Sequence, residues 1–288
     1  MLYDIAIIGT GPAALSAALT LKLHEKEILW FGSASYSDKV EKSEKIANYP
    51  GLGLIKGSDL NEKFREHAKA LDLTSIDKKV TNILPMQDQF SLLAENEMYE
   101  AKTVLLATGV VPAKGYVNEA EYLGRGVSYC ATCDGFLYKG KTIAVFCGSE
   151  RYEHEVEYLA EIADKVYLSC GYKNVGITHP KVERIDPIKE VKGGMKVTGI
   201  VLANGTEIAV DGLFCLRNAV APSTLVPGLA VEGAHIIVNR QQETNYPGLY
   251  AAGDCTGRPY QIAKAVGEGN VAAHSILEYL SARKKEQE

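Results

Sequence analysis

The N-terminal segment places the strongest constraint on the fold of this chain. Leu2 to Ile8 is a short, largely branched apolar run that predicts a buried parallel strand, and an alanine- and leucine-rich helix follows to about Leu23. Gly9-Thr10-Gly11-Pro12-Ala13-Ala14 joins them. In such a turn the first glycine allows a tight bend, the second lets a pyrophosphate approach the backbone, and a small third residue lets helix pack on strand. The segment therefore predicts a dinucleotide site, with phosphates at the helix N-terminus.

Three later strands are expected to end in residues that bear on a nucleotide site. Glu27 to Phe31 ends in Gly32-Ser33, where an NAD site usually has an acidic residue, so the dinucleotide is not specified as NAD. Thr103 to Ala107 runs into Thr108-Gly109, and Gly248 to Asp254 ends in an acid. Asp254 is a candidate acceptor for a ribitol or ribose hydroxyl, with an ordinary turn aspartate as the alternative.

The middle of the chain starts the same pattern again. Lys141 to Phe146 repeats the N-terminal strand, Cys147-Gly148-Ser149-Glu150-Arg151-Tyr152 follows, and a helix runs to about Ala163. Two link-like passages, Val111 to Gly126 and Asn218 to Pro227, flank this part. We therefore expect an α/β protein with two Rossmann-like, three-layer nucleotide-binding-type domains, the second inserted into the first.

Further elements follow from the apolar pattern. Residues 33 to 57 are polar and irregular, and a loop of that length is typical of a functional or mobile segment. The other elements expected are helices at Leu60 to Leu71 and Pro259 to Leu280, and strands at Ser75 to Ile83, Phe90 to Ala94, Val166 to Cys170, Met195 to Leu202 and Leu213 to Leu216.

Cys130-Ala131-Thr132-Cys133-Asp134-Gly135 carries the chemistry. Two cysteines at this spacing can close a small disulfide ring, and a lowered thiol pKa in such a motif produces a nucleophile near neutral pH. A zinc site is the alternative, but four sulfur ligands need a second pair, and Cys147, Cys170, Cys215 and Cys255 stand apart. Asp134 adds a candidate proton donor, because disulfide reduction takes up two protons.

Composition excludes several classes of function. At 288 residues, with 46% hydrophobic and 23% charged residues, the chain is typical of an ordinary soluble protein. A net charge of −5 provides no basic surface for nucleic acid. No run approaches the roughly 18 apolar residues of a membrane span, and the N-terminus lacks a signal-peptide pattern, so a cytoplasmic location is expected.

Taken together, five motifs resemble the low-molecular-weight thioredoxin reductases over nearly the whole chain. They are Gly9-x-Gly11-x-x-Ala14, Asn48-Tyr49-Pro50-Gly51, Ala107-Thr108-Gly109, Cys130-Ala131-Thr132-Cys133-Asp134-Gly135 and Ala252-Gly253-Asp254. The resemblance implies a homodimer with one FAD per chain, an FAD domain made of residues 1–111 and 221–288, and an inserted redox-disulfide domain, residues 112–220.

The resemblance also implies roles for individual residues. Cys133 would face the flavin and receive the electron pair, Cys130 would attack the thioredoxin disulfide, and Asp134 would handle protons. The residues expected to bind FAD are Gly9, Gly11, Pro12, Ala13, Ala14, Phe31, Gly32, Asn48, Ala107, Thr108, Gly109, Gly253, Asp254, Gln261 and Ile262. No metal ligands are expected.

One departure from the family is informative. Members bind NADPH in the inserted domain through a second Gly-x-Gly-x-x-Ala and a His-Arg-Arg cluster. Here those glycine and alanine positions hold Cys147, Ser149 and Tyr152, which would crowd the pyrophosphate and separate helix from strand. Cys170-Gly171-Tyr172 follows the next strand and lacks the cations that a 2′-phosphate needs. We therefore expect a degenerate NADPH site that binds no NADP.

Electrons must then reach the flavin from another donor. The sequence resembles the pyridine-nucleotide-independent branch, the ferredoxin-dependent flavin thioredoxin reductases, which implies ferredoxin and thioredoxin as partners. Lys39, Lys42 and Lys45 are candidates for docking an acidic ferredoxin, although a solvated charged loop is the commoner explanation. Three alternatives stay open: a diflavin-linked disulfide oxidoreductase, an NADPH-dependent reductase with an unusual site, and a non-catalytic flavin-binding sensor.

Cys147 and Cys170 carry a separate hypothesis. Each is expected to end one of two neighbouring strands, so their sulfurs could meet at the vacated nucleotide site. Two unrelated buried cysteines are the alternative.

Overall fold

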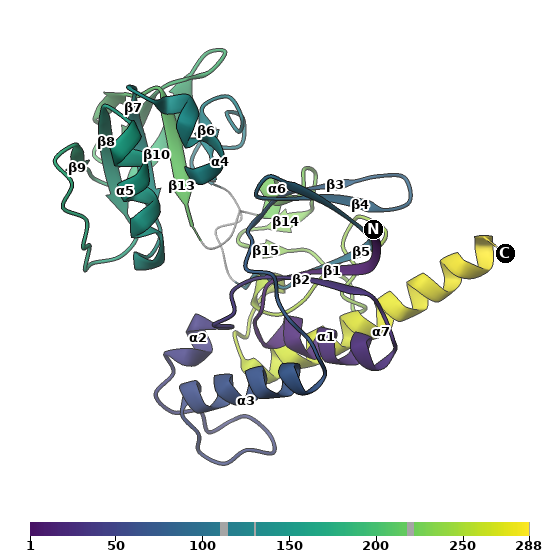
Figure 1. Cartoon of the computed structure of the whole chain (residues 1–288). Helices are drawn as coiled ribbons and strands as arrows, with labels where there is room; N and C mark the ends of the chain where they lie inside the picture. Colours follow the sequence, from purple (N-terminus) through teal and green to yellow (C-terminus); the bar gives the residue numbers. More distant parts are fainter. Residues whose placement is uncertain (110–114, 130, 218–221, 288) are drawn as a thin grey trace. The chain divides into compact units, whose positions relative to one another are not determined.

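A computed structural model describes residues 1–109, 115–129, 131–217 and 222–287 of the chain. The chain divides into two compact units: Met1–Ala113 with Ala221–Glu288, here called the discontinuous unit, and Lys114–Val220, here called the inserted unit. Both are shown in Figure 1, and each is described by itself.

The sheet of the discontinuous unit has the strand order β2-β1-β5-β4-β3, and β16 also pairs with β5. Strands β1, β2, β5 and β16 run parallel, whereas β3 and β4 are antiparallel to their neighbours. Ile8 pairs with Phe31 and Leu106, and Leu106 pairs with Ala251, so the four parallel strands end level. The strands are β1 (Leu2–Ile8), β2 (Ile28–Phe31), β3 (Val80–Pro85), β4 (Phe90–Ala94), β5 (Glu97–Leu106) and β16 (Leu249–Ala251).

Helices α1 (Pro12–Leu23) and α7 (Ile262–Gln287) run side by side against this sheet (Figure 1). Alternate residues of β1, Ile5 and Ile7, are fully buried in the core cluster that both helices share. The helices approach closely, because a Cβ on Gly269 would lie 2.1 Å from the Ala13 carbonyl oxygen. The unit also contains α2 (Asp38–Glu41), α3 (Gly57–Ala70), α6 (Pro222–Leu225), β14 (Val231–Glu232), β15 (His235–Ile236) and the 3₁₀ turn η3 (Asp254–Thr256).

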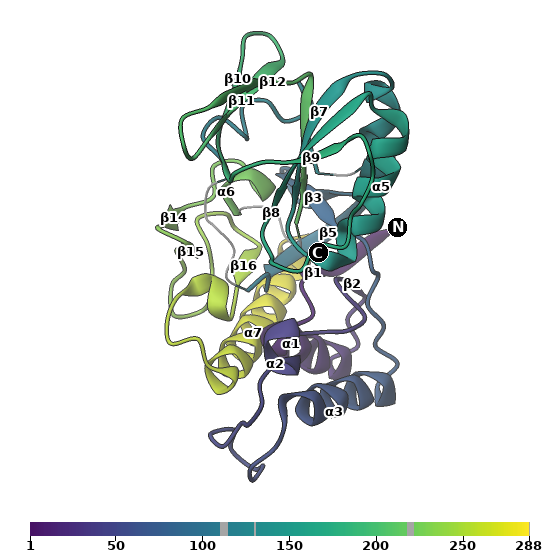
Figure 2. The same ribbon diagram turned by 90° about the vertical axis from the view of Figure 1, so that its left-hand side faces the viewer.

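The inserted unit has a five-stranded parallel sheet in the order β6-β13-β7-β8-β9, and α5 packs against it (Figure 2). A second, antiparallel sheet has the order β10-β11-β12. The elements are β6 (Val127–Ser128), α4 (Ala131–Asp134), η1 (Gly135–Tyr138), β7 (Thr142–Cys147), η2 (Glu150–Tyr152), α5 (Glu153–Ile162), β8 (Lys165–Cys170), β9 (Val182–Arg184), β10 (Ile188–Gly193), β11 (Val197–Leu202), β12 (Glu207–Ala209) and β13 (Gly212–Leu216).

The predicted α/β fold class with two Rossmann-like domains is confirmed by this topology. Three local expectations were wrong. The strand expected from Ser75 begins at Val80, because Ile76 makes an isolated bridge to Phe31 and charged residues follow it. Residues 248–254 form a shorter strand, which ends where Gly253 adopts a φ of 90°. The C-terminal helix begins at Ile262, so Tyr260 and Gln261 precede it.

The two passages expected to be links are packed segments where the structure describes them. Glu119 and Tyr122 are buried at 1% and 5% exposure, and Val117 bridges to Glu190. Residues 222–225 form α6, in which Leu225 is buried. Residues 111–114 and 218–221 lie outside the described residues.

Candidate functional site

The level strand ends of the discontinuous unit bring the predicted cofactor residues to one edge. Gly9 follows β1, Gly32 follows β2, and Ala107 follows β5. Gly253 lies two residues beyond β16. In open parallel sheets, ligands bind at the carboxyl ends of the strands, so this edge has the location expected of a nucleotide site.

Gly9 is required by close backbone packing. Its φ is 117°, and a Cβ there would lie 2.2 Å from the carbonyl oxygen of Ala107. Its amide donates to the Phe31 carbonyl at 2.8 Å, and the Trp30 indole donates to the Gly9 carbonyl at 2.6 Å. The turn between β1 and α1 is therefore fixed against both neighbouring strands.

The same edge has room and hydrogen-bonding capacity for a ligand. A Cβ on Gly11, the residue capping α1, would meet no described atom within 4 Å, and the same holds for Gly109. The Thr108 Oγ1 is buried without a hydrogen-bond partner among the described residues. Buried hydroxyls are nearly always paired, so this orphaned atom indicates a missing partner. These residues fit a dinucleotide whose phosphates lie at the start of α1.

Asp254 is held by contacts that the sequence did not reveal. Its carboxylate pairs with Lys39 at 3.3 Å, and the Lys39 ammonium lies 5.7 Å from the centre of the Tyr260 ring. Lys264 donates to the Gly253 carbonyl at 2.7 Å, and Glu268 accepts from the Gly253 amide at 2.8 Å. Lys264 and Glu268 thus hold the turn that presents Asp254. The sequence contained one signal for these two residues, since they stand four positions apart on a predicted helix.

Two other predicted residues meet across the chain. Asn48 donates from its amide to the Gln261 side-chain oxygen at 2.7 Å, although 213 positions separate them. Ile262 packs beside the small core cluster of Val40, Ile46 and Leu60. The long segment after β2 is therefore tied to the start of α7, on the side of the predicted cofactor edge.

The cysteine motif begins α4 in the inserted unit. Cys130 and the side chain of Cys133 lie outside the described residues. Ala131 is fully buried, and a Cβ on Gly135 would lie 3.0 Å from atoms of Tyr158 and Ile162 on α5. The motif's backbone is therefore packed onto α5, while the Phe136 side chain that follows it is 65% exposed.

A buried polar cluster lies directly before the motif. Tyr129 donates to the Glu119 carboxylate at 2.9 Å, and Arg217 pairs with the same carboxylate at 2.9 Å. Burial and the Glu119 charge raise the pKa of Tyr129, so its hydroxyl stays protonated as a donor. The Arg217 guanidinium also lies 5.1 Å from the centre of the Tyr116 ring. Sequence reasoning missed Tyr116 and Glu119 because it treated residues 111–126 as a link, and no local signal joined them to Tyr129 and Arg217.

The turn after β7 is filled by the protein's own atoms. The Ser149 Oγ is buried and, like the Thr108 Oγ1, has no hydrogen-bond partner among the described residues. The Cys147 Sγ lies 3.3 Å from the Ser149 carbonyl and 3.7 Å from the Tyr172 hydroxyl. Glu153, in the first turn of α5, accepts hydrogen bonds from the Tyr172 hydroxyl at 2.6 Å and from the Gly176 amide at 2.8 Å. A carboxylate therefore stands at the helix start, where a pyrophosphate would otherwise bind.

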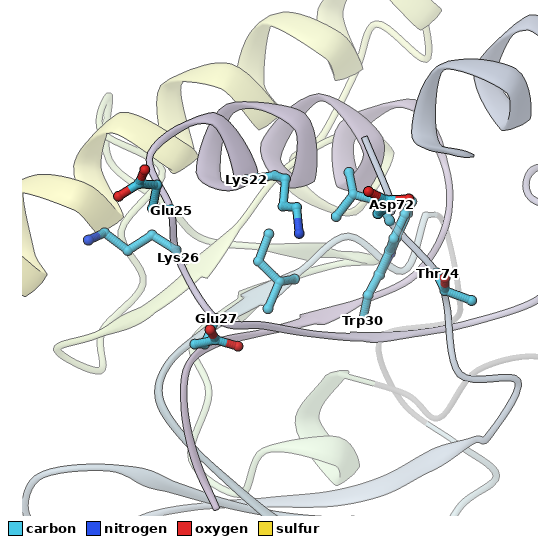
Figure 3. A pocket seen from close by; sticks show the side chains of 9 residues that line it. Lys22, Glu25, Lys26, Glu27, Trp30, Asp72 and Thr74 are labelled. Carbon is cyan, nitrogen blue, oxygen red and sulfur yellow. The ribbon is translucent and has the colours of Figure 1, made fainter. Parts of the chain in front are cut away.

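A pocket of about 440 Å³ lies elsewhere on the discontinuous unit (Figure 3). Its lining includes Lys22 at the end of α1, Trp30 of β2, and Asp72. None of the predicted cofactor residues lines it, so it is not the predicted site. Within the described ranges, no three His, Cys, Asp or Glu side chains are arranged to hold a metal ion. No helix in those ranges is long and apolar enough to cross a membrane.

Comparisons with known proteins extend this picture. A family model described as pyridine nucleotide-disulphide oxidoreductase matches residues 3–149 and 171–269. The thioredoxin reductase of Helicobacter pylori strain J99 is 34% identical over 308 residues, covering 97% of this chain and 99% of that protein.

Solved structures show the same likeness over the whole chain. A ferredoxin-flavin thioredoxin reductase from Clostridium acetobutylicum is 42% identical with a TM-score of 0.91, covering 99% of both chains. A second structure described in the same words is 45% identical with a TM-score of 0.81, covering 98% of this chain and 99% of that one. A thioredoxin reductase from Gloeobacter violaceus is 27% identical with a TM-score of 0.77, covering 98% of this chain and 95% of that one.

Proposed function

Because this chain belongs to the pyridine nucleotide-disulphide oxidoreductase family and, within it, to the thioredoxin reductases, we propose that it reduces thioredoxin with electrons from ferredoxin. Its activity as an oxidoreductase acting on a disulfide follows from the family. We further propose the electron donor, the route of the electrons through the cofactor, and the roles of individual residues. The electrons pass through one FAD per chain and the Cys130–Cys133 pair, and NADPH is not the donor.

The closed turn after β7 is the observation that carries the choice of donor. Glu153 places a negative charge at the start of α5, and its hydrogen bonds from Tyr172 and Gly176 fix it there. A phosphate at this point would meet a carboxylate instead of free helix amides. The residues present do not fit NADPH. The names of the two structures from Clostridium acetobutylicum support ferredoxin in its place.

The predicted FAD domain, residues 1–111 and 221–288, lies within the discontinuous unit and is proposed to hold FAD, which accepts electrons singly and passes them on in pairs. The amides at the start of α1 would bind its phosphates beside Gly11. Thr108 would supply the hydroxyl that has no partner among the described residues, and Asp254 would accept from a sugar hydroxyl. The Asn48–Gln261 hydrogen bond would hold the start of α7 in place.

The Cys motif of the predicted redox-disulfide domain, residues 112–220, is proposed to perform the exchange with thioredoxin. Cys130 attacks the thioredoxin disulfide, Cys133 then attacks the mixed disulfide, and a thioredoxin dithiol leaves. Asp134 moves the protons that accompany this exchange. The reverse change at the Cys pair, from disulfide to dithiol, uses the electron pair that the flavin supplies.

The driving force is sufficient for this direction. A plant-type ferredoxin has a potential of roughly −400 mV, and thioredoxin has about −270 mV. The difference of about 130 mV corresponds to roughly 6 kcal/mol for two electrons. Reduced ferredoxin can therefore drive thioredoxin reduction without a nucleotide.

The partners in the proposal are thioredoxin, ferredoxin and a second copy of the chain. Lys42 and Lys45 are exposed and would attract an acidic ferredoxin, whereas Lys39 is already paired with Asp254. A cytoplasmic location completes the proposal, since thiols are kept reduced there.

The proposal is tested by reconstituting the whole electron path under anaerobic conditions. Photoreduced ferredoxin, the holoenzyme and oxidised thioredoxin are mixed, and new thioredoxin thiols are counted. The wild type should produce two thiols per electron pair, and Cys130→Ser should produce none while its flavin still bleaches with ferredoxin. Unchanged turnover in Cys130→Ser would overturn the role of Cys130.

Flavin released after denaturation separates the remaining alternatives. One FAD per chain fits the proposal, whereas two flavins per chain would establish the diflavin enzyme. A chain that binds FAD but produces no thioredoxin thiols would be a sensor.

A further inference from the structure

Two cysteines stand directly opposite each other at the carboxyl ends of β7 and β8. The parallel register pairs Ile143 with Val166 and continues to Cys147 with Cys170. Neighbouring strands lie about 4.8 Å apart, and Cα atoms joined by a disulfide are usually about 4.4–6.8 Å apart. The register therefore places these two positions within reach of a disulfide.

Both side chains project from the same face of the sheet. Alternate residues of β7, namely Val145 and Cys147, belong to the core cluster that includes residues of α5. On β8, Leu168 belongs to the same cluster and Cys170 packs against it. Because side chains alternate along a strand, the two sulfurs lie on one face as direct neighbours.

The two thiols differ in their access to solvent. Cys147 is fully buried, whereas Cys170 is partly exposed, and both are free in this structure. The Tyr172 hydroxyl lies 3.7 Å from the Cys147 sulfur. A small oxidant can therefore reach Cys170 first, with a second thiol directly behind it.

We propose that Cys147 and Cys170 are a second redox pair, separate from Cys130 and Cys133, that closes to a disulfide when the protein meets a hydroperoxide. The site lies where the family's nucleotide would bind. Its substrate class is hydrogen peroxide or a small organic hydroperoxide. The disulfide that forms bridges the two strands at the closed turn.

The chemistry balances in two steps. The Cys170 sulfur attacks the O–O bond, so one oxygen leaves as water or an alcohol and the other stays on sulfur as a sulfenic acid. The Cys147 sulfur then attacks the Cys170 sulfur, the S–S bond forms, and water leaves. Overall the two thiols lose two electrons and two protons, and the hydroperoxide is reduced to water or to an alcohol and water.

The surroundings make this pair slow compared with a catalytic thiol. The pKa of the Cys170 thiol is raised to about 11, chiefly by burial and then by the neighbouring Cys147. Arg184 partly offsets this rise, and Glu153 contributes to it. Burial also raises the pKa of Cys147. Protonated thiols react slowly, so the pair would respond to sustained peroxide without intercepting each turnover.

The experiment uses the full chain with FAD bound. The protein is reduced with dithiothreitol, desalted anaerobically, exposed to hydrogen peroxide, alkylated with N-ethylmaleimide in denaturant and digested. Mass spectrometry should find a peptide joining Cys147 to Cys170, two hydrogens lighter than the separate thiols and cleaved again by dithiothreitol. Full alkylation of both residues after Cys130 and Cys133 have linked would overturn the proposal.

Variants define the specificity of the link. The Cys130→Ser/Cys133→Ser double variant should still form it, which excludes exchange with the catalytic pair. Cys255→Ser is the matched control, because Cys255 is a buried thiol of the other unit that donates to backbone carbonyls, and the link should persist. Cys170→Ser should abolish the link and leave Cys147 open to alkylation, and any other pairing of Cys147 would contradict the assignment.

Phenylarsine oxide gives a measurement on the wild type that does not depend on a variant folding. This reagent bridges two neighbouring thiols. The reduced wild type should bind two equivalents per chain, whereas Cys147→Ser and the Cys130→Ser/Cys133→Ser variant should each bind one. A single equivalent in the wild type would show that Cys147 and Cys170 are too far apart.

Discussion

Both units contain a strand, a turn and a helix in the same order. The turn has free space for a ligand in the discontinuous unit and is occupied by protein side chains in the inserted unit. In the discontinuous unit, a Cβ on Gly11 would meet no described atom within 4 Å, and the Thr108 hydroxyl is buried without a described partner. In the inserted unit, the Glu153 carboxylate at the start of α5 already accepts two hydrogen bonds, while the Ser149 hydroxyl in the turn, like that of Thr108, is buried without a described partner. The two turns therefore differ in the carboxylate at the helix start and in the space beside Gly11, not in the presence of an unpaired hydroxyl.

A nucleotide site can therefore be lost while the fold that contained it is kept. The parallel strands, the helix after the first turn and the buried apolar face are retained in the inserted unit. Only a few side chains at the helix start decide whether phosphate meets free amides or a carboxylate.

The largest effect is expected from substituting Gly9 in the turn between β1 and α1. Gly9→Ala would place a Cβ 2.2 Å from the Ala107 carbonyl oxygen at a φ of 117°, so β1 and β5 must separate. We expect the purified variant to lose about nine-tenths of its FAD, as measured by the flavin released on denaturation.

Gly205→Ala is the control for backbone strain alone. Its φ is 88°, but a Cβ there would meet no described atom within 4 Å. This variant should keep its flavin, and equal loss in both variants would show that the close approach of Gly9 is not the cause.

The next effect concerns the charges that the inserted unit supplies to itself. Glu119→Gln would leave Arg217 as a buried cation without its carboxylate, because the Arg217 side chain is 14% exposed and the Glu119 side chain is 2% exposed. We expect the free energy of unfolding, measured in urea, to fall by about 3–5 kcal/mol. Glu207→Gln, which breaks the exposed pair with Lys192, should lose no more than about 1 kcal/mol. If both variants lost a similar amount of unfolding free energy, the buried pair would not be more stabilising than the exposed one.

A smaller effect is expected at the orphaned hydroxyl. Thr108→Val removes an oxygen that has no described protein partner, so FAD affinity should fall about fivefold to tenfold, corresponding to a hydrogen bond of about 1 kcal/mol. Calorimetric titration of the apoprotein with FAD measures this change.

Thr103→Val is the matched control, because Thr103 lies on β5, five residues before Thr108. The Thr103 hydroxyl donates to the Asp4 carbonyl at 2.8 Å, so its loss should lower stability and leave FAD affinity unchanged. If Thr108→Val lowered stability and left FAD affinity intact, the Thr108 hydroxyl would have a structural role only.

The smallest effect is a pH dependence at the filled turn. Burial and Cys147 raise the pKa of Cys170 to about 11 from the ordinary thiol value of 9.0. Alkylation of Cys170 by iodoacetamide should accelerate about tenfold per pH unit up to that pKa, whereas unfolded chains should level off near pH 9.

The sign for stability follows from the same shift. The folded state holds the Cys170 proton more tightly, so its contribution to stability is complete below about pH 9 and is lost as pH rises toward 11. An alkylation rate of the native protein that levels off at pH 9 would contradict the shift.

The sequence predicted best where local pattern decides structure. The strand, turn and helix around Gly9 follow from branched apolar residues, glycines and alanines within a few positions, and the structure has β1 and α1 there. The second turn was likewise placed correctly between β7 and α5, because it repeats that pattern. These signals are local, so no long-range information was needed.

Contacts between distant residues could not be predicted in this way. Lys39 meets Asp254 across 215 positions, and one of three lysines proposed for docking is thereby already paired. Glu119 gives no apolar signal, yet it is buried because Arg217 and Tyr129 satisfy it. The strand β10 was missed because its buried residues, Ile188 and Val191, stand three positions apart instead of two, across an irregularity in the pairing with β11.

The choice of electron donor is tested most directly by watching flavin absorbance while the oxidised holoenzyme is mixed anaerobically with NADPH, NADH and reduced ferredoxin in separate experiments. The filled turn after β7 predicts bleaching by ferredoxin alone. Rapid bleaching by NADPH would contradict it and would restore a working nucleotide site in the inserted unit.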